Sequence, residues 1–228
     1  YRNTDDGRMV DVDWLDGAWQ PVLRSQVLAD GGSSYELRLP GDKDWRPFLT
    51  FGFEDTMSES GVGGFTRDGQ WLYGSLSTGE DLPRLVRWSR EQLQTCRTTC
   101  NPELVHQSST GALGVSLSDI NTGEPTVLQE VDLRSRRVVL DPSVQPELNA
   151  LTKLAGSNDF SIVGRDLSDR LWLVAIGSDQ QGAEYWLWDR DRQQPRKLFS
   201  VQPRLNDYDL APMESLDLLA RDGCRLPA

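Results

Sequence analysis

Hydrophobic and polar residues alternate in short runs along most of the chain. The runs are rich in β-branched and aromatic residues, and glycine, proline, asparagine and aspartate separate them. This pattern is typical of β-strands joined by turns. It predicts strands at residues 8–15, 20–27, 34–39, 46–53, 62–66, 71–77, 84–89, 112–119, 127–133, 137–140, 160–165, 171–177, 184–189 and 196–200.

One segment has a different period. Within Pro146–Leu154, three leucines recur at helical spacing, and Gly156 follows where a helix would end. A glycine just past the last helical turn can take the left-handed conformation that stops a helix. We expect one short helix here, inserted between strands.

The strands recur as a unit of polar turn, strand, loop and second strand. The clearest copies are Phe65–Ser89 and Arg165–Asp189, and both end in an aromatic residue followed by a polar one. Equivalent points in the copies lie 49, 45 and 56 residues apart, at Leu37, Val86, Val131 and Leu187. A period of about 40–50 residues with about four strands is the signature of propeller blades.

The expected fold is therefore all-β, a β-propeller or partial propeller of about four four-stranded blades with one inserted helix. A single four-stranded sheet cannot bury both of its faces, whereas stacked blades can, and the eight tryptophans suit the packing between them. A β-sandwich is the alternative, but it does not explain the period. The predicted blades occupy about 8–53, 62–105, 110–140 and 158–200, within a propeller region 1–209.

Charge excludes two classes of partner. The chain has 24 basic and 35 acidic residues and a net charge of −11. A nucleic-acid binder needs a basic face, and anionic lipid also attracts basic surfaces, so we expect no nucleic-acid partner and no membrane partner. No apolar run approaches the ~20 residues of a membrane-spanning helix. The chain starts at Tyr1 without a leader, which we interpret as the product of processing or excision from a longer protein.

The three cysteines leave several interpretations open. Cys96 and Cys100 are four residues apart, Cys224 is distant, and His106 is the only histidine. A zinc site would have to combine Cys96, Cys100 and His106. A local disulfide between Cys96 and Cys100 would imply an oxidising compartment. Free thiols in a loop are the commonest state of such a pair.

Motif searches identify no catalytic, cofactor-binding or metal-binding residue. The chain lacks G-x-S-x-G, and a serine triad could use only His106. The glycines of Gly61–Gly64 run into a strand and are expected to form a turn between blades. Asp11–Gly17 fails the EF-hand spacing, which leaves an irregular calcium site as an alternative. Asp189–Arg192 is interpreted as a solvated turn of alternating charge.

The C-terminal half carries a resemblance to a known family. The residues concerned are Phe160–Arg170, Trp172–Val174, Gly177–Gly182, Tyr185–Arg190, Lys197–Phe199, Leu210–Glu214, Ala220–Gly223 and Leu226–Pro227. Their order and spacing resemble the end of the propeller domain in the prolyl oligopeptidase family of serine peptidases. The resemblance extends over roughly Val127–Ala228, including the short helix, and it implies that 210–228 is a linker and the start of a catalytic domain.

That resemblance implies a function without catalysis. In the family, the catalytic serine, aspartate and histidine lie in an α/β-hydrolase domain after the link, so no triad residue is carried over to this chain. The propeller is a cap that admits short peptides and excludes folded proteins. We therefore expect a gating portion of a serine peptidase, whose partners are the catalytic domain of the same parent chain and short peptides.

Alternative functions and the setting of the protein stay open at this stage. A stand-alone propeller that binds a protein or ligand, as in TolB-like and WD-repeat modules, is the main alternative, and a propeller glycosidase is a third. Uncovered blade faces would favour a homodimer. A periplasmic or cytoplasmic location fits the sequence, and the candidate Cys96–Cys100 bridge favours the periplasm.

Overall fold

The computed structural model describes residues 2–3, 9–10, 12–15, 20–58, 60–96 and 100–227. The chain divides into two compact units. Unit A comprises residues 1–113 and 121–124, and unit B comprises residues 114–120 and 125–228. Each unit is described by itself.

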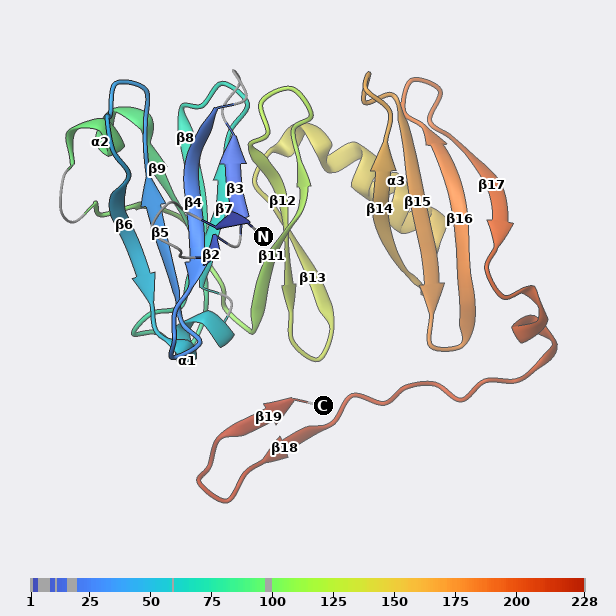
Figure 1. Ribbon diagram of the computed structural model, residues 1–228. Helices are drawn as coiled ribbons and strands as arrows, with labels where there is room; N and C mark the ends of the chain where they lie inside the picture. Colours follow the sequence, from blue (N-terminus) through green and yellow to red (C-terminus); the bar gives the residue numbers. More distant parts are fainter. Residues whose placement is uncertain are drawn as a thin grey trace. The chain divides into compact units, whose positions relative to one another are not determined.

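Four antiparallel sheets form the body of the protein (Figure 1). We call them blades 1 to 4 in chain order. Blade 1 has β3 (Val12–Leu15), β4 (Pro21–Val27), β5 (Ser33–Leu37) and β6 (Arg46–Phe51), and blade 2 has β7 (Gly61–Phe65), β8 (Trp71–Leu76), β9 (Arg84–Ser89) and β10 (Glu103–Gln107). Blade 3 has β11 (Ala112–Ser118), β12 (Pro125–Val131) and β13 (Ser135–Val139), and blade 4 has β14 (Asp159–Arg165), β15 (Leu171–Ser178), β16 (Gln181–Asp189) and β17 (Gln194–Ser200). Neighbouring strands of each sheet follow one another along the chain, which confirms the propeller-like all-β fold class.

Blade 3 departs from the expected four strands. Its sheet contains only β11, β12 and β13 among the described residues. After β13 the chain enters the 3-10 helix η1 (Pro142–Val144) and then α3 (Gln145–Ala155). The predicted helix therefore follows the third strand of this sheet, and the expectation of four strands is wrong for blade 3 among the described residues.

Helix α3 confirms the predicted helix and its end. Pro146 lies in its first turn, where the missing N–H of proline has no cost. Gly156 follows the helix with φ +65°, and its N–H donates to the carbonyl of Thr152 at 3.0 Å. Leu148, Leu151 and Ala155 are buried, so the apolar stripe packs inward.

The core of unit A joins blades 1 and 2. Its buried members are Leu23, Leu37, Leu39, Val62, Leu72, Val86, Trp88 and Leu93. Trp88 is completely buried, and its ring meets Phe48 of blade 1 edge-on, with the ring centroids 5.2 Å apart. Such aromatic pairs add to the stabilisation from buried area. The expected packing of a tryptophan between blades is thus found here.

The glycines of Gly61–Gly64 lie in a strand, in agreement with the strand predicted at residues 62–66, and the interpretation of them as a turn between blades is wrong. They lie within β7, and the indole N–H of Trp14 on blade 1 donates to the carbonyl of Gly63 at 2.9 Å. A side chain at Gly64, where φ is +140°, would place its Cβ 3.1 Å from that indole. Glycine is needed here because an aromatic residue of the neighbouring blade packs directly on the backbone.

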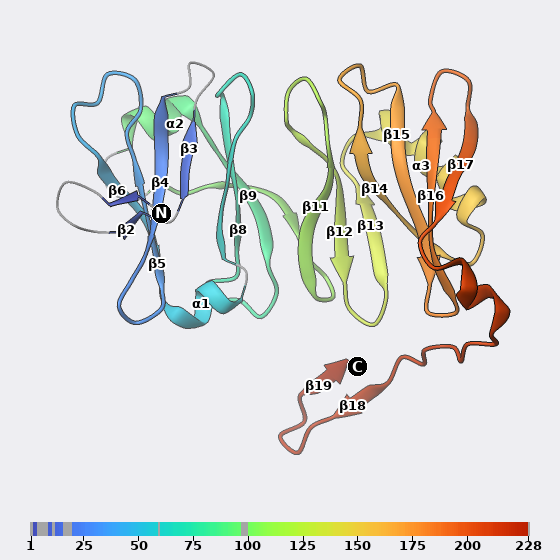
Figure 2. The same cartoon turned by 45° about the vertical axis from the view of Figure 1, so that its right-hand side comes forward.

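The core of unit B joins blades 3 and 4 through α3 (Figures 1 and 2). It contains the three helix residues together with Leu117, Val127, Val144, Phe160, Trp172, Val174, Ile176 and Trp188. Trp172 is completely buried and Trp188 is 3% exposed. The helix therefore supplies apolar area to both blades.

Blades 2 and 4 repeat the same turn at a spacing of 100 residues. The N–H of Thr66 donates to the carbonyl of Trp71, and the N–H of Asp166 donates to that of Leu171. Leu72 pairs with Trp88, and Trp172 pairs with Trp188. The sequence repeat is therefore also a structural repeat. In the structure Val86 corresponds to Trp186, one position away from Leu187, which the sequence pattern had given as its equivalent.

The remaining elements are short. They are β1 (Arg2–Asn3), β2 (Met9–Val10), α1 (Phe53–Met57), α2 (Arg90–Thr95), η2 (Pro203–Asp207), β18 (Asp217–Leu219) and β19 (Arg225–Pro227). The sequence pattern predicted neither α1 nor α2. Among the described residues, no helix has the length and apolar character to cross a membrane.

Candidate functional site

Cys96 and Cys100 form a disulfide. This outcome overturns both the interpretation as free thiols and the zinc site with His106, because each sulfur is bonded to the other. In the described part of the chain, no group of three or more His, Cys, Asp and Glu side chains could hold a metal ion. Cys224 is a free thiol and is exposed.

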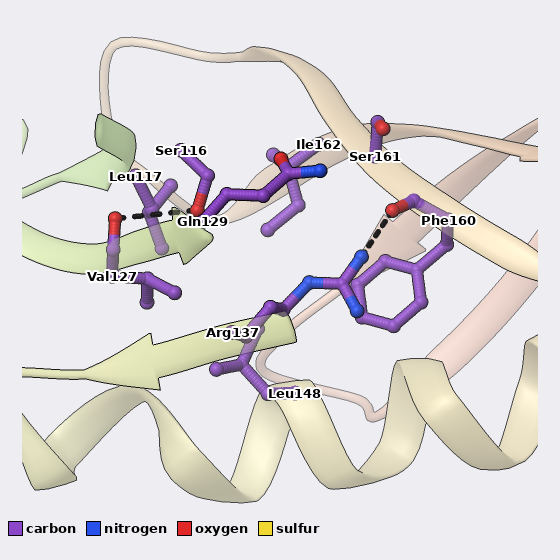
Figure 3. Close-up of a pocket in the computed structure, with 9 residues that line it drawn as sticks. All are labelled: Ser116, Leu117, Val127, Gln129, Arg137, Leu148, Phe160, Ser161 and Ile162. Atoms are coloured by element: carbon purple, nitrogen blue, oxygen red, sulfur yellow. Dashed lines mark hydrogen bonds between the residues drawn. The ribbon is translucent and has the colours of Figure 1, made fainter. Parts of the chain in front are cut away.

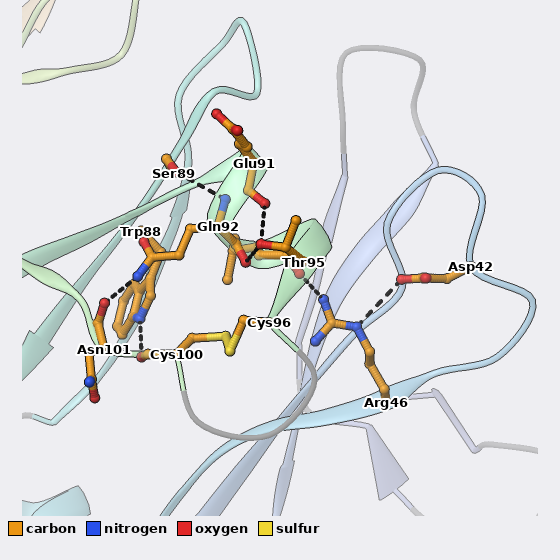
Figure 4. The surroundings of a disulfide bond; sticks show 11 residues. Asp42, Arg46, Trp88, Ser89, Glu91, Gln92, Thr95, Cys96, Cys100 and Asn101 are labelled. Atoms are coloured by element: carbon orange, nitrogen blue, oxygen red, sulfur yellow. Dashed lines mark hydrogen bonds and ion pairs between the residues drawn. A yellow bond between two sulfur atoms is a disulfide. The ribbon is translucent and has the colours of Figure 1, made fainter.

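The disulfide lies at the edge of the unit A core (Figure 4). Helix α2 begins at Ser89, whose hydroxyl accepts from the N–H of Gln92 at 3.1 Å, and Cys96 follows its last turn. The carbonyl of Cys100 accepts from the indole N–H of Trp88 at 2.9 Å. The disulfide thus links the end of α2 to Cys100, whose carbonyl accepts the hydrogen bond of the buried Trp88. Its role is therefore structural.

A second polar cluster lies around Asp169 in unit B. Its carboxylate accepts from the indole N–H of Trp172 at 2.8 Å, from Arg165 at 3.2 Å, and from Arg190. Arg190 also lies over the Trp172 ring, 4.6 Å from its centroid, and 3.5 Å from a carboxylate oxygen of Glu147 on α3. Arg190 is therefore not part of a merely solvated turn, which corrects the interpretation of Asp189–Arg192 at this residue. The cluster ties two turns of blade 4 to the helix.

A cavity lies between blades 3 and 4, inside unit B (Figure 3). Its volume is about 140 Å³. The lining residues come from β11, β12, β13, α3 and β14, and they are Ser116, Leu117, Val127, Gln129, Arg137, Leu148, Phe160, Ser161 and Ile162. The walls of the cavity are mixed: five lining residues are apolar, and the four polar ones include one cation, the guanidinium of Arg137.

Arg137 is held by Phe160 of the neighbouring blade. Its guanidinium lies 3.7 Å from the centroid of the Phe160 ring and donates to the Phe160 carbonyl (Figure 3). Burial lowers the pKa of Arg137, which the negative charge of Asp159 partly opposes. Within the described residues no carboxylate forms an ion pair with this side chain. The charge of Arg137 is thus partly desolvated and not neutralised by contact.

Gln129 lies directly opposite Arg137 on the adjacent strand. Its amide donates to the hydroxyl of Ser135 at 3.0 Å. Ser116 donates its hydroxyl to the carbonyl of Val127 at 3.2 Å, so it can only accept a further hydrogen bond. The side chains at the cavity that can still donate a hydrogen bond are therefore those of Arg137, Gln129 and Ser161.

A second, more open cavity of about 260 Å³ continues along β11 and β14. It shares Ser116, Leu117 and Ile162 with the first. Val115 and Val163 contribute to its walls and are 46% and 50% exposed. The two cavities therefore form one continuous depression that opens between these two strands.

The other candidates from the sequence do not converge on this site. His106 lies on β10 of blade 2 and pairs in register with Leu85. The acidic side chains of Asp11–Gly17 fall outside the described residues. The motif searches missed Arg137 because one arginine in a strand has no spacing signature. The available signal was an arginine on the same sheet face as the buried Val127, since Arg137 pairs with Gln129, two residues after Val127 on β12.

The comparisons with known proteins bear on the whole chain. No protein-family model matches it. It is 31% identical over 194 residues, which is 85% of this chain, to dipeptidyl aminopeptidase BIII of Pseudoxanthomonas mexicana. Together with the resemblance in Phe160–Pro227, this similarity supports a relation to the prolyl oligopeptidase family.

Other relatives of the family match more distantly. Dipeptidyl peptidase family member 6 of Caenorhabditis elegans is 24% identical over 166 residues, 72% of this chain. The chain spans 27% and 21% of the lengths of these two relatives. A post-proline cleaving enzyme from Rickettsia typhi, at 10% identity, matches 94% of this chain and 31% of its own, with a TM-score of 0.46. That score is too low to carry an argument, so the relation to the prolyl oligopeptidase family rests on sequence similarity.

Proposed function

We propose that this chain is the non-catalytic cap of a prolyl-oligopeptidase-like serine peptidase. Its role is to limit the access of peptides to a catalytic domain that is not part of the chain. The observation that carries the proposal is the 31% identity to a dipeptidyl aminopeptidase over 85% of the chain, which corresponds to 27% of that relative. The gating is steric, because blades are rigid sheets with buried faces and inner strands that resist separation.

The depression between β11 and β14 is the part of the chain best suited to select peptides by size. Both strands lie at the edges of their sheets, and the depression has exposed valines at its walls. An extended peptide can lie against such strands, whereas a folded protein is too wide to enter. Val163 is therefore the residue at which added bulk should narrow the passage.

The absence of catalysis in the chain itself is tested directly. The purified 228-residue chain is incubated with chromogenic dipeptide and ester substrates, and in parallel with a fluorophosphonate probe. We expect no hydrolysis and no labelled serine. Covalent labelling of any serine in the folded chain would overturn the proposal.

Gating is tested in the parent protein. We expect Val163→Trp to lower kcat/KM for a decapeptide substrate more than for a dipeptide substrate, because only the longer peptide needs the full width of the passage. Leu167→Trp is the matched control, since Leu167 lies in the turn just after β14, is 96% exposed and does not line the depression. An unchanged ratio of the two kcat/KM values in Val163→Trp would contradict a gate at this position.

We also propose an oxidising compartment, such as the periplasm, for this chain. The support is the Cys96–Cys100 disulfide, because such bonds form and persist where thiols are not kept reduced. Mass spectrometry of the native protein after alkylation of free thiols provides the test. Alkylation of Cys224 alone is the expected result, and alkylation of Cys96 or Cys100 would contradict it.

A further inference from the structure

Arg137 differs from the other arginines around it. Arg136, its neighbour on β13, forms an ion pair with Glu130, and Arg165 and Arg190 both pair with Asp169. Arg137 contacts the Phe160 carbonyl and ring, and Asp159 acts on it only through space. In a chain of net charge −11, Arg137 thus lies at a cavity wall with no carboxylate of the described residues in contact with it.

The walls of the cavity strengthen any electrostatic attraction inside it. Leu117, Val127, Leu148 and Phe160 are buried and line the cavity, and the ring of Phe160 lies against the guanidinium. Charges interact more strongly in such surroundings than in water because the local dielectric constant is lower. The volume of about 140 Å³ is close to that of an engineered cavity of about 150 Å³ that binds benzene. There is room for an acid with a short side chain.

We propose that this cavity binds a carboxylate group, held by Arg137 and flanked by Gln129. A guanidinium has five N–H donors in a planar fork, and the bond to the Phe160 carbonyl uses one of them. Two parallel N–H groups of such a fork match the two oxygens of a carboxylate. The stacking on Phe160 fixes the plane of the fork before any ligand arrives. The site does not depend on the proposed gating function.

The ligand enters from the open cavity along β11 and β14. Ser116, Leu117 and Ile162 line both cavities, so an extended molecule can place its carboxylate at Arg137 and its remainder in the wider part. Short peptides have this shape. Their carboxylate comes either from the C-terminus or from an acidic side chain, and the binding experiment separates these two sources.

Three variants distinguish loss of the Arg137 charge from loss of the folded structure. Arg137→Gln removes the charge, and circular dichroism reports whether the blades remain intact. Gln129→Glu keeps Arg137 and places a carboxylate directly opposite it on β12, which should occupy the fork from within. Arg134→Gln is the matched control, because Arg134 lies exposed in the same hairpin and does not line the cavity.

Binding to the 228-residue chain is measured by isothermal titration calorimetry and by NMR of the arginine Nε–H groups. The probes are acetate, dialanine, dialanine amide and N-acetyl-aspartate α-amide. We expect acetate to bind and to shift the Arg137 signal. Binding of dialanine but not its amide would identify a terminal carboxylate, and binding of N-acetyl-aspartate α-amide would identify an acidic side chain.

Arg137→Gln and Gln129→Glu should each weaken acetate binding about tenfold or more, because charge-assisted hydrogen bonds are lost or already satisfied. Arg134→Gln should bind as the wild type does. The proposal is overturned if acetate does not bind the folded wild-type chain. It is equally overturned if the folded Gln129→Glu variant binds acetate as tightly as the wild type.

Discussion

Asp169 offers the sharpest test of how unit B is held together. It occupies a left-handed position, with φ +55°, at the place where the equivalent turn of blade 2 has Gly69, with φ +69°. Glycine suits this backbone conformation better than aspartate, so the structure predicts that the carboxylate of Asp169 contributes more stability than the backbone strain costs. Replacing it with asparagine, glycine or alanine separates the hydrogen bond, the charge and the backbone strain.

The magnitudes follow from its contacts. Alanine leaves the indole N–H of the completely buried Trp172 without its acceptor, which costs about 1–3 kcal/mol. It also removes the pairs with Arg165 and Arg190, which are about one fifth exposed and together contribute about 1 kcal/mol. Aspartate and alanine both bear the cost of a non-glycine residue in the left-handed region, ~1 kcal/mol, so this cost is largely common to both. We expect Asp169→Ala to destabilise unit B by about 2–4 kcal/mol.

The other two substitutions should cost less, for different reasons. Asp169→Gly loses the same contacts but relieves the backbone, so it should be about 1 kcal/mol less destabilising than alanine. Asp169→Asn keeps an oxygen for Trp172 and loses only the charge pairing, at about 1 kcal/mol. The expected order of destabilisation is alanine, then glycine, then asparagine.

Urea unfolding followed by tryptophan fluorescence and circular dichroism measures these differences by linear extrapolation. Should units A and B unfold in separate transitions, the effect should fall on one of them and leave the other as an internal control. The reasoning is refuted if Asp169→Asn is as destabilising as Asp169→Ala, because the hydrogen bond to Trp172 would then carry no stability. A cost below about 1 kcal/mol for alanine would refute it as well.

Three further predictions concern the disulfide, the partly exposed ion pair of Lys197 and Glu184, and a glycine in a strand. Replacing Cys96 and Cys100 with serine should lower the unfolding free energy by about 2 kcal/mol, from the loop-closure entropy of a five-residue loop, and a dithiol should reproduce the effect on Tm in the wild type only. The hydrogen bond from Lys197 lowers the pKa of Glu184, so its contribution is complete above the unfolded pKa of about 4.3 and is lost as pH falls through the lower folded value. Urea unfolding of Glu184→Gln should therefore differ from the wild type at pH 7 but not below both pKa values, and a constant difference across pH would contradict the assignment. Gly64→Val should lower Tm by several degrees because its Cβ meets an indole 3.1 Å away at φ +140°, whereas Gly114→Val, where a Cβ meets no atom within 4 Å, should change Tm little.

The sequence by itself determined the elements and their period. Alternating apolar positions predicted the strands, since a strand exposes one face at every second residue, and three leucines with Gly156 predicted α3 and its end. The resemblance to the prolyl oligopeptidase family was also visible in the sequence, because the motifs of the C-terminal half occur in the same order and spacing although each of them is weak. Strands, the helix and the order of the motifs each depend on residues that are close together in the sequence, so the residue types in each segment specify them.

The tertiary structure decided how distant residues meet. The sequence pattern predicted both a strand at residues 62–66 and a turn at Gly61–Gly64, whereas the structure shows why glycines lie inside strand β7: the indole of Trp14 from another blade packs on them. Alternating charge made Arg190 look solvated, although Asp169 and Trp172 hold it. Arg137 became notable only when the register of β12 and β13 and the approach of Phe160 left its charge at a cavity wall. Contacts between strands distant in sequence depend on packing geometry, which no local pattern encodes.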